Sequence, residues 1–317
     1  MAGQPVYLYK LTNKNQTSIS LLNFAATWQD FEVTEAGQKR SLIEKFTDLN
    51  DYIQTPYEVG KTIGRVAGRI GQAQFNINGT DYQLTPNDGA NIIHSGDQGL
   101  QMQLFDAKVN SDNSVTFSHT VKDEDDFPGT LKVEVQYSLN DDDEVTITYR
   151  GQTDHDTLFN PSCHVYFNLG AESIKQQQLQ INSKRFLDMD EHKLPTGKIL
   201  SATNAYDFKH FKKIGQGLKQ LKPLDKDEFD NVYLVHDKAA TLKDDQRAID
   251  FYTDRNGLVI FTASPTAQND SGHDFSSIAM ELMTLPDAIN HDDFGNTILL
   301  AGQKVSYTNK FKYRRLD

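Results

Sequence analysis

The strongest constraint on the fold is a period of two in hydrophobicity, carried by short runs of β-branched and aromatic residues. It is clearest at 131–137 and 144–149, where apolar and polar residues alternate on both sides of the turn 140–143. Successive side chains of a strand point to opposite faces, so this pattern predicts an antiparallel meander with one wet face. Helices do not alternate with these runs, as a parallel α/β fold requires, so the sequence predicts an all-β fold.

Two further pairs of apolar runs surround glycine-containing turns. One pair spans 75–84 with Asn78-Gly79 at its centre, and the other spans 248–261 with Arg-Asn-Gly before residue 258. Asn-Gly provides the positive φ that a tight hairpin turn requires. Both pairs are therefore predicted to be β-hairpins.

Residues 36–52 are ambiguous, because Leu42, Phe46 and Leu49 fall at helix spacing while residues 41–46 suit a strand equally well. No Pro/Gly/Ser-rich linker and no fixed-period repeat interrupts the chain. Residues 1–317 are therefore predicted to form a single domain.

The charge of the chain argues against nucleic acid as a partner. Lys and Arg number 32 against 44 Asp and Glu, which gives a formal net charge of -12 and opposes the counterion release that drives nonspecific nucleic-acid binding. Neutral or cationic ligands fit better. The acidic clusters 123–126 and 141–144 lack the glycine and terminal glutamate of a calcium loop, so we interpret them as solvated turns rather than a metal site.

The sequence shows no signal for secretion or membrane insertion, and it has too few cysteines for a disulfide or a cysteine-based metal site. The N-terminal residues lack the charged-then-apolar order of a signal peptide, and no run of 18 apolar residues occurs, so we expect a cytoplasmic protein without a membrane partner. Cys163 is the single cysteine, which excludes an intrachain disulfide and a cysteine-based zinc site. We expect Cys163 to be a small buried hydrophobe.

The segment 162–169, SCHVYFNL, is the most informative strand. Strand geometry puts Cys163 and its apolar neighbours on one face, and His164, Tyr166 and Asn168 on the other. A polar face with a histidine suggests the lining of a cleft. The alternative is a histidine that is exposed or satisfied by a neighbouring carbonyl, and the strand alone leaves both open.

A second histidine, His94, lies among small residues at 91–99, which allow the backbone to bend and a ligand to approach. Upstream, two arginines lie between glycines at 64–71. Their spacing matches neither GxxxxGK[ST] nor GxGxxG in a βαβ unit, so a phosphate loop is excluded.

Near the C-terminus, Glu281 is the one acid in the apolar run 278–283. Burial disfavours the charged form and raises the pKa of a carboxyl group, which makes such a residue a candidate general base. The alternative, an edge residue that faces solvent, stays open from this segment alone.

Taken together, these segments resemble the aldose 1-epimerase (galactose mutarotase) family. The resemblance rests on separate motifs in the family's order over 57–311, and only the first fifty residues resemble it weakly. The matching segments are GRVAGRI at 64–70, the hairpin 79–84, NIIHSG at 91–96, HVYFNL at 164–169, LPTGKI at 194–199, Asp207-Phe208, 229–231 and MELMTLPDAINH at 280–291.

The resemblance implies a large antiparallel β-sandwich of the galactose mutarotase type with few short helices, and an open sugar cleft across one sheet. Glu281 matches the family's catalytic base and His164 its catalytic acid. Arg69, His94 and Asp230 match its sugar-binding positions. The implied enzyme uses no metal or cofactor, takes a monosaccharide or small saccharide, and is a monomer or homodimer.

Departures from the family pattern leave the preferred sugar open. Gly68 replaces the usual Asn before the arginine, Ser95 replaces the glycine after the first histidine, and Leu282-Met283 replace Thr-Gln. Phe105 occupies the region of a frequent tryptophan. Altered hydrogen-bonding groups change which hydroxyls are recognised, because specificity follows buried polar pairing.

Mutarotation removes the proton of the anomeric hydroxyl and donates one to the ring oxygen, which opens the ring; rotation about C1–C2 and closure give the other anomer. We expect an ionised Glu281 and a protonated His164 to supply these steps from opposite sides of the hemiacetal. Galactose, glucose, xylose and maltose all remain candidate substrates.

Three other functions remain as alternatives. A β-sandwich glycoside hydrolase requires paired carboxylates, for which Glu281 and Asp230 are the candidates. A non-catalytic sugar-binding or regulatory protein of the mutarotase type is the second. A hexose-6-phosphate epimerase is the third, although no extra basic cluster near the motifs is evident to seat a phosphate.

Overall fold

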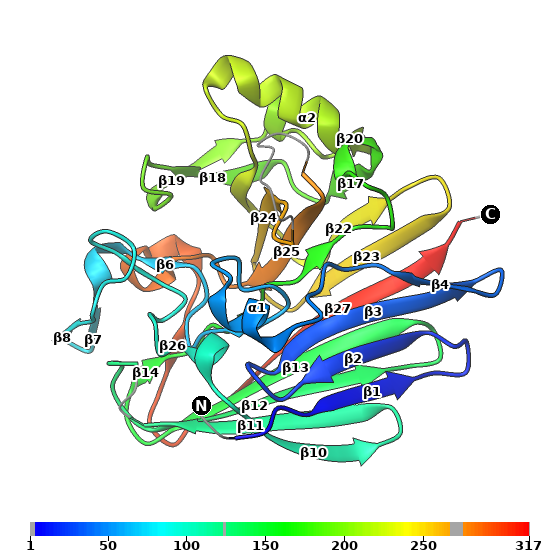
Figure 1. Cartoon of the computed structure of the whole chain (residues 1–317). Helices are drawn as coiled ribbons and strands as arrows, with labels where there is room; N and C mark the ends of the chain where they lie inside the picture. The colour runs from blue at the N-terminus through cyan, green and yellow to red at the C-terminus, as the bar shows by residue number, and fades with distance from the viewer. Residues whose placement is uncertain (1–3, 123–124, 267–274, 317) are drawn as a thin grey trace.

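The computed structural model describes residues 4–122, 125–266 and 275–316 and consists mainly of antiparallel β-sheets (Figure 1). Within these residues the α-helices are two short ones, α1 (Leu49–Gln54) and α2 (Ile214–Leu221), so the all-β prediction is confirmed. Neither helix is long and apolar enough to cross a membrane. Single 3₁₀ turns lie at Gly71–Ala73, Leu100–Met102, Ile174–Gln176, Asn204–Tyr206, Lys222–Leu224, Ala288–Asn290 and Asp292–Phe294.

A nine-stranded sheet forms the larger layer, and the last strand of the chain lies in its middle (Figure 1). β27 pairs with β13 on one side and β23 on the other, so the C-terminal segment joins two halves of the sheet. Its strands in spatial order are β10 (Asp106–Ser111), β11 (Ser114–Val121), β12 (Leu131–Leu139), β13 (Glu144–Thr153), β27 (Lys304–Arg315), β23 (Arg247–Thr253), β22 (Asp237–Lys243), β17 (Gln178–Ile181) and β20 (Lys212–Lys213).

A six-stranded sheet forms the second layer, with strands in the order β16 (Tyr166–Phe167), β25 (Ser277–Met283), β24 (Gly257–Ala263), β21 (Asp230–Leu234), β18 (Arg185–Met189) and β19 (Pro195–Ser201). An N-terminal sheet contains β1 (Leu8–Thr12), β2 (Ser18–Leu22), β3 (Thr27–Glu35) and β4 (Gln38–Ser41). Short pairs join β5 (Thr62–Ile63) to β15 (Ser162–Cys163), β6 (Arg69–Ile70) to β9 (Ile92–Ile93), β7 (Gln74–Ile77) to β8 (Thr80–Gln83) and β14 (Thr157–Leu158) to β26 (Ile298–Leu299).

Two of the predicted strand pairs are confirmed. β12 and β13 form a hairpin that closes at Leu139 and Val145, and their buried residues alternate with more exposed ones as the period of two predicts. β7 and β8 pair around Asn78-Gly79, both with positive φ. The local turn signal was sufficient for both because each strand pairs with its neighbour in sequence.

The predicted hairpin at 248–261 is wrong. β23 pairs with β22 and β27 in the nine-stranded sheet, whereas β24 pairs with β21 and β25 in the six-stranded sheet. Arg255 in the connection is buried, and its guanidinium donates hydrogen bonds to the carbonyl oxygens of Pro161 and Leu282. These bonds hold the connection between the two sheets, so the turn leads from one layer to the other.

The ambiguous segment 36–52 contains both kinds of element. It includes β4, and α1 begins only at residue 49, where the side chain of Asp48 accepts a hydrogen bond from the backbone N–H of Asn50. Such an N-cap satisfies a helix donor that has no intrahelical partner. The helix ends before Pro56, since the residue that precedes a proline is biased to extended geometry.

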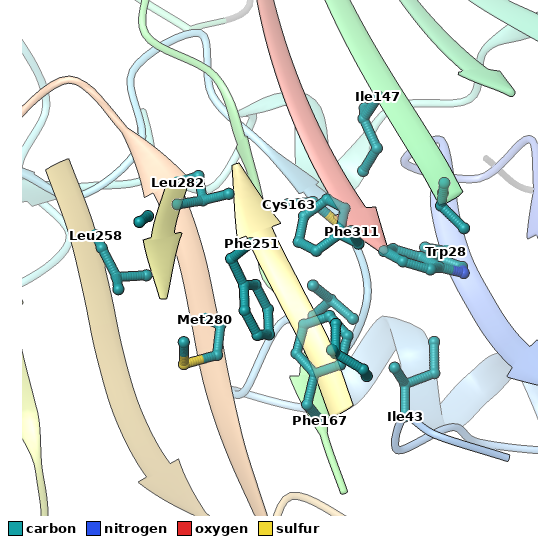
Figure 2. Packing of buried hydrophobic residues seen from close by; sticks show 14 of the residues in the cluster. Trp28, Ile43, Ile147, Cys163, Phe167, Phe251, Leu258, Met280, Leu282 and Phe311 are labelled. Atoms are coloured by element: carbon teal, nitrogen blue, oxygen red, sulfur yellow. The ribbon is translucent and has the colours of Figure 1, made fainter. Parts of the chain in front are cut away.

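The main core lies between the two large sheets (Figure 2). Trp28 is fully buried, and its ring contacts Phe167 and Phe311 with centroid distances of 6.1 and 5.1 Å. The apolar face predicted for the strand at 162–169 is confirmed, because its four residues are all buried in this core: Cys163, Val165, Phe167 and Leu169. Burial also raises the pKa of the Cys163 thiol to about 12, so it is an inert core residue.

One hydroxyl in this core provides a stability test. Tyr137 is buried on β12 and donates a hydrogen bond of 2.9 Å to the carbonyl oxygen of Ala26. Replacing Tyr137 by Phe is expected to lower the free energy of unfolding by about 0.5–1.5 kcal/mol, because the bond is lost while the ring still packs. Urea unfolding followed by fluorescence measures the change.

Tyr149 on the adjacent strand is the matched control. It is equally buried, but its hydroxyl has no hydrogen-bond partner in the described part of the chain. Tyr149→Phe is therefore expected to cost nothing or to stabilise slightly. Equal losses in the two variants would contradict the role given to the Tyr137 hydrogen bond.

Candidate active site

A cavity of about 580 Å³ lies on the face of the six-stranded sheet that is turned away from the main core. Its lining includes residues of β21, β24 and β25, together with residues from the segments 56–102, 164–166 and 189–193 and with Pro286. All five residues predicted from the sequence line it: Arg69, His94, His164, Asp230 and Glu281. Segments more than two hundred positions apart in sequence thus meet in one cavity.

Glu281 and His164 lie in direct contact at the floor of this cavity. Glu281 is 3% exposed on β25, a strand paired on both sides, so the solvent-facing edge position is excluded. Its neighbours Met280 and Leu282 point into the core, and the alternation of the strand turns Glu281 to the opposite face. Nε2 of His164 lies 3.4 Å from Oε1 of Glu281.

Backbone contacts fix the position of His164. Its N–H donates to the carbonyl of Lys61, and its own carbonyl accepts from the N–H of Gly60. The ring packs against Tyr166, with centroids 5.0 Å apart. Nδ1 of His164 and the hydroxyl of Tyr166 are both buried without a hydrogen-bond partner among the described residues. Buried polar atoms of this kind are normally hydrogen-bonded, so both are candidate contacts for a ligand in the cavity.

The electrostatics of the pair follow from burial. Burial raises the pKa of Glu281 to about 8; Asp230 acts in the same direction and Arg69 against it. Burial lowers the pKa of His164 to about 4. Between these values the pair holds a single proton, and both shifts favour the carboxyl as its site near neutral pH. This differs from the expected ionised carboxylate and protonated imidazole, because removal from water disfavours both charges.

Arg69 and His94 are held by a pair of short strands. β6 begins at Arg69 and pairs with β9, which ends just before His94. The Nε of Arg69 lies 2.6 Å from a carboxylate oxygen of Asp88, which fixes the guanidinium at the rim. This ion pair leaves the other guanidinium nitrogens available as donors.

The protonation state of His94 is set by a backbone contact. The N–H of Gly68 donates a hydrogen bond of 3.1 Å to Nδ1 of His94. A ring nitrogen that accepts carries no proton, so the proton of the neutral ring is on Nε2. Burial lowers the pKa of His94 well below its usual range and keeps the ring neutral. His94 is therefore a hydrogen-bond donor at Nε2.

Asp230 is the first residue of β21 and forms an ion pair with Lys193, which was not predicted from the sequence. The ammonium of Lys193, in the turn between β18 and β19, lies 2.8 Å from Asp230 and 3.0 Å from Glu228. Lys193 also lines the cavity, as do Tyr57 and Phe261. No motif spacing relates these three residues, and their proximity follows only from the pairing of strands that are distant in sequence.

Some of the departures from the family pattern line the cavity, and the others lie beneath it or in the core. Ser95 lies beneath the cavity, where its hydroxyl accepts a hydrogen bond of 2.8 Å from the N–H of Val66 and supports the arginine segment. Leu282 and Phe105 are in the core. Gly68 and Met283 line the cavity, so these two departures bear on the sugar that is bound. Asn168, predicted on the cleft-facing side, instead donates to the backbone carbonyls of Ala171 and Ser276.

The chain is similar to known proteins over nearly its whole length. The sequence model described as aldose 1-epimerase matches residues 7–312. A maltose epimerase from Levilactobacillus brevis is 38% identical over 98% of this chain and 96% of its own length. An aldose 1-epimerase from Streptococcus thermophilus is 34% identical over 96% and 93%. The crystal structure of a galactose 1-epimerase from Lactobacillus acidophilus, 26% identical, matches with a TM-score of 0.88 over 100% of this chain and 97% of that one.

Proposed function

The chain belongs to the aldose 1-epimerase family and interconverts the anomers of an aldose, and from this premise we propose that Glu281 and His164 carry out the proton transfers. The observation that carries the proposal is their contact of 3.4 Å at the floor of the cavity. Arg69, His94 and Asp230 are proposed to bind the hydroxyls of the sugar. Membership of an isomerase family disfavours the hydrolase alternative.

The geometry changes one expectation about the mechanism. A nitrogen and an oxygen 3.4 Å apart leave no space for a sugar ring between them, so the pair approaches one edge of the hemiacetal rather than its two sides. That edge carries the anomeric O1 and the ring O5, which are both bonded to C1. Two groups in mutual contact can therefore reach both oxygens.

The steps balance with the single proton that the pair holds. Glu281 as base takes the proton of the O1 hydroxyl while His164 donates its proton to O5, and the C1–O5 bond breaks to give the open aldehyde. Rotation about C1–C2 exposes the other face of the carbonyl. Closure reverses the transfers and returns the pair to its initial state. We propose that the resting proton moves from Glu281 to His164 before ring opening, since the two groups lie 3.4 Å apart.

The bound hydroxyls are those of a neutral sugar. Among the residues that the structure describes, two Lys or Arg side chains line the cavity, and each is paired: Arg69 with Asp88, and Lys193 with Asp230 and Glu228. These two cations face three carboxylates, so the cavity has no excess positive charge there for a phosphate dianion, and the hexose-6-phosphate alternative is disfavoured. The maltose epimerase relative adds a reducing disaccharide to the proposed substrates.

Polarimetry tests the proposed function. Freshly dissolved α-glucose, α-galactose and β-maltose each drift to anomeric equilibrium, and the protein is expected to accelerate the drift without releasing new reducing sugar. Sugar binding by calorimetry with no acceleration would instead establish the non-catalytic alternative. Release of glucose from maltose would establish hydrolysis.

The pH dependence of kcat/KM is expected to be bell-shaped, with limbs near pH 4 and pH 8. Below the lower pKa the pair gains a second proton and has no base; above the upper one it loses its only proton and has no acid. The two values belong to the coupled pair. Initial rates on both sides of these limits, corrected for the buffer-catalysed rate, measure the profile. A flat profile across pH 8 would contradict the raised pKa.

A further inference from the structure

A row of aromatic rings leads from the catalytic histidine to the rim of the cavity. The ring of Tyr166 lies 5.0 Å from His164, Phe261 lies 6.3 Å from Tyr166, and Tyr57 lies 6.4 Å from Phe261, all measured between centroids. Tyr166 is fully buried, whereas Phe261 and Tyr57 are half-buried, so the row emerges gradually into the open cavity. All three residues line the cavity, and the proton transfers use none of them.

The local structure places each ring. Phe261 lies on β24 directly opposite Asp230 in the register of β21 and β24. Tyr57 follows Pro56, where the chain leaves α1 and turns to the cavity. In Figure 1, α1 lies near the centre and the β18–β19 hairpin at the upper left, and residues that adjoin each contribute to the same cavity lining.

Lys193 supplies a polar edge to this aromatic wall. Its ammonium lies 5.6 Å from the centroid of Phe261 and is held between Asp230 and Glu228. An ammonium has three donors, and two carboxylates leave one of them for a ligand. A cation beside an aromatic face is the surface that suits a sugar ring, whose C–H face packs on the aromatic ring while its hydroxyls accept hydrogen bonds.

We propose that Tyr57, Phe261 and Lys193 form a subsite for the second ring of a reducing disaccharide whose free anomeric carbon lies at Glu281 and His164. This inference rests on the proposed function, because the catalytic pair is its fixed point. The polar floor with Arg69 and His94 serves the reducing ring. The aromatic wall with Lys193 at its edge serves the second ring, and one cavity of about 580 Å³ contains both parts.

The test compares disaccharide with monosaccharide in the same variants. Tyr57→Ala removes the outer ring, and Lys193→Met removes the ammonium while keeping most of the stem. In each, the ratio of kcat/KM for maltose to that for glucose is expected to fall about tenfold, mainly through a higher KM for maltose. Tyr57→Leu, which keeps apolar volume without an aromatic face, provides a second variant should the alanine variant fail to fold.

The matched controls are Tyr7→Ala and Lys198→Met. Tyr7 is an exposed tyrosine away from the cavity, and Lys198 is an exposed lysine on β19 of the same hairpin as Lys193. Both should leave the ratio unchanged.

The outcomes separate the inference from the proposed function. Activity of the unmodified protein on glucose but not on maltose, or an unchanged ratio in the Tyr57 and Lys193 variants, would overturn the subsite and leave the catalytic assignment intact. Failure of the unmodified protein to accelerate either sugar would overturn the proposed function, and the subsite with it.

Discussion

Replacing Glu281 by glutamine is expected to lower kcat for anomer exchange by about 10²–10⁴-fold, the range that a positioned acid or base group contributes. The amide has nearly the shape of the carboxyl but can neither accept nor release a proton at these pH values. Initial rates by polarimetry at saturating sugar measure the loss.

The fold is expected to survive this change. Burial raises the pKa of Glu281 to about 8 and so favours the neutral carboxyl near pH 7, and a neutral amide replaces it without a new buried charge. Urea unfolding should therefore differ little between the two proteins. Glu134→Gln, on the outer face of β12, is the control for loss of a carboxylate outside the cavity. A Glu281→Gln protein with near-normal kcat would reject Glu281 as the base.

The sequence predicted the floor of the site but not its wall. Glu281 and His164 each occupy a strand-like run with apolar neighbours, and the period of two is enough to place such a residue on the face opposite the core. The ordered motifs then indicate that Arg69, His94 and Asp230 accompany them. Whether two such faces meet depends on which strands pair, and here the pairing of β16 with β25 brings them together.

Neither Tyr57 nor Lys193 was predicted, because their contacts also depend on how distant segments pack together. Tyr57 follows a helix of six residues and Lys193 lies in a hairpin turn, where side-chain direction has no simple period. Lys193 is identified only by its contacts with Glu228 and Asp230. A lysine beside the LPTGKI motif was visible in the sequence, but charge alone did not distinguish it from a solvated turn residue.

The incorrect hairpin at 248–261 shows how tertiary structure overrides a local signal. Arg-Asn-Gly is compatible both with a hairpin within one sheet and with a connection between two sheets, and the strands on either side of it are apolar in both cases. Burial of Arg255 against carbonyl oxygens of Pro161 and Leu282 decides for a connection between sheets. A charged side chain that is usually exposed is thus buried in the connection between the sheets, and composition gives no indication of this.

The resting proton of the catalytic pair is another property that sequence does not supply. Reference pKa values place a carboxylate beside an imidazole that is partly protonated near neutrality. Burial reverses this order, with Glu281 raised to about 8 and His164 lowered to about 4. Between about pH 4 and pH 8 the pair still holds one proton, so the proton transfers remain possible while their starting state changes.

Replacing His164 by asparagine is expected to reduce kcat by about 10²–10⁴-fold as well, because the amide cannot relay a proton to the ring oxygen. The decisive measurement is the double variant with Glu281→Gln. If the two residues act as one relay, removal of either already disables it, and the double variant should be about as slow as each single one. His155→Asn, an exposed histidine outside the cavity, should keep full activity. Losses that multiply in the double variant would show two independent contributions and contradict a shared proton between Glu281 and His164.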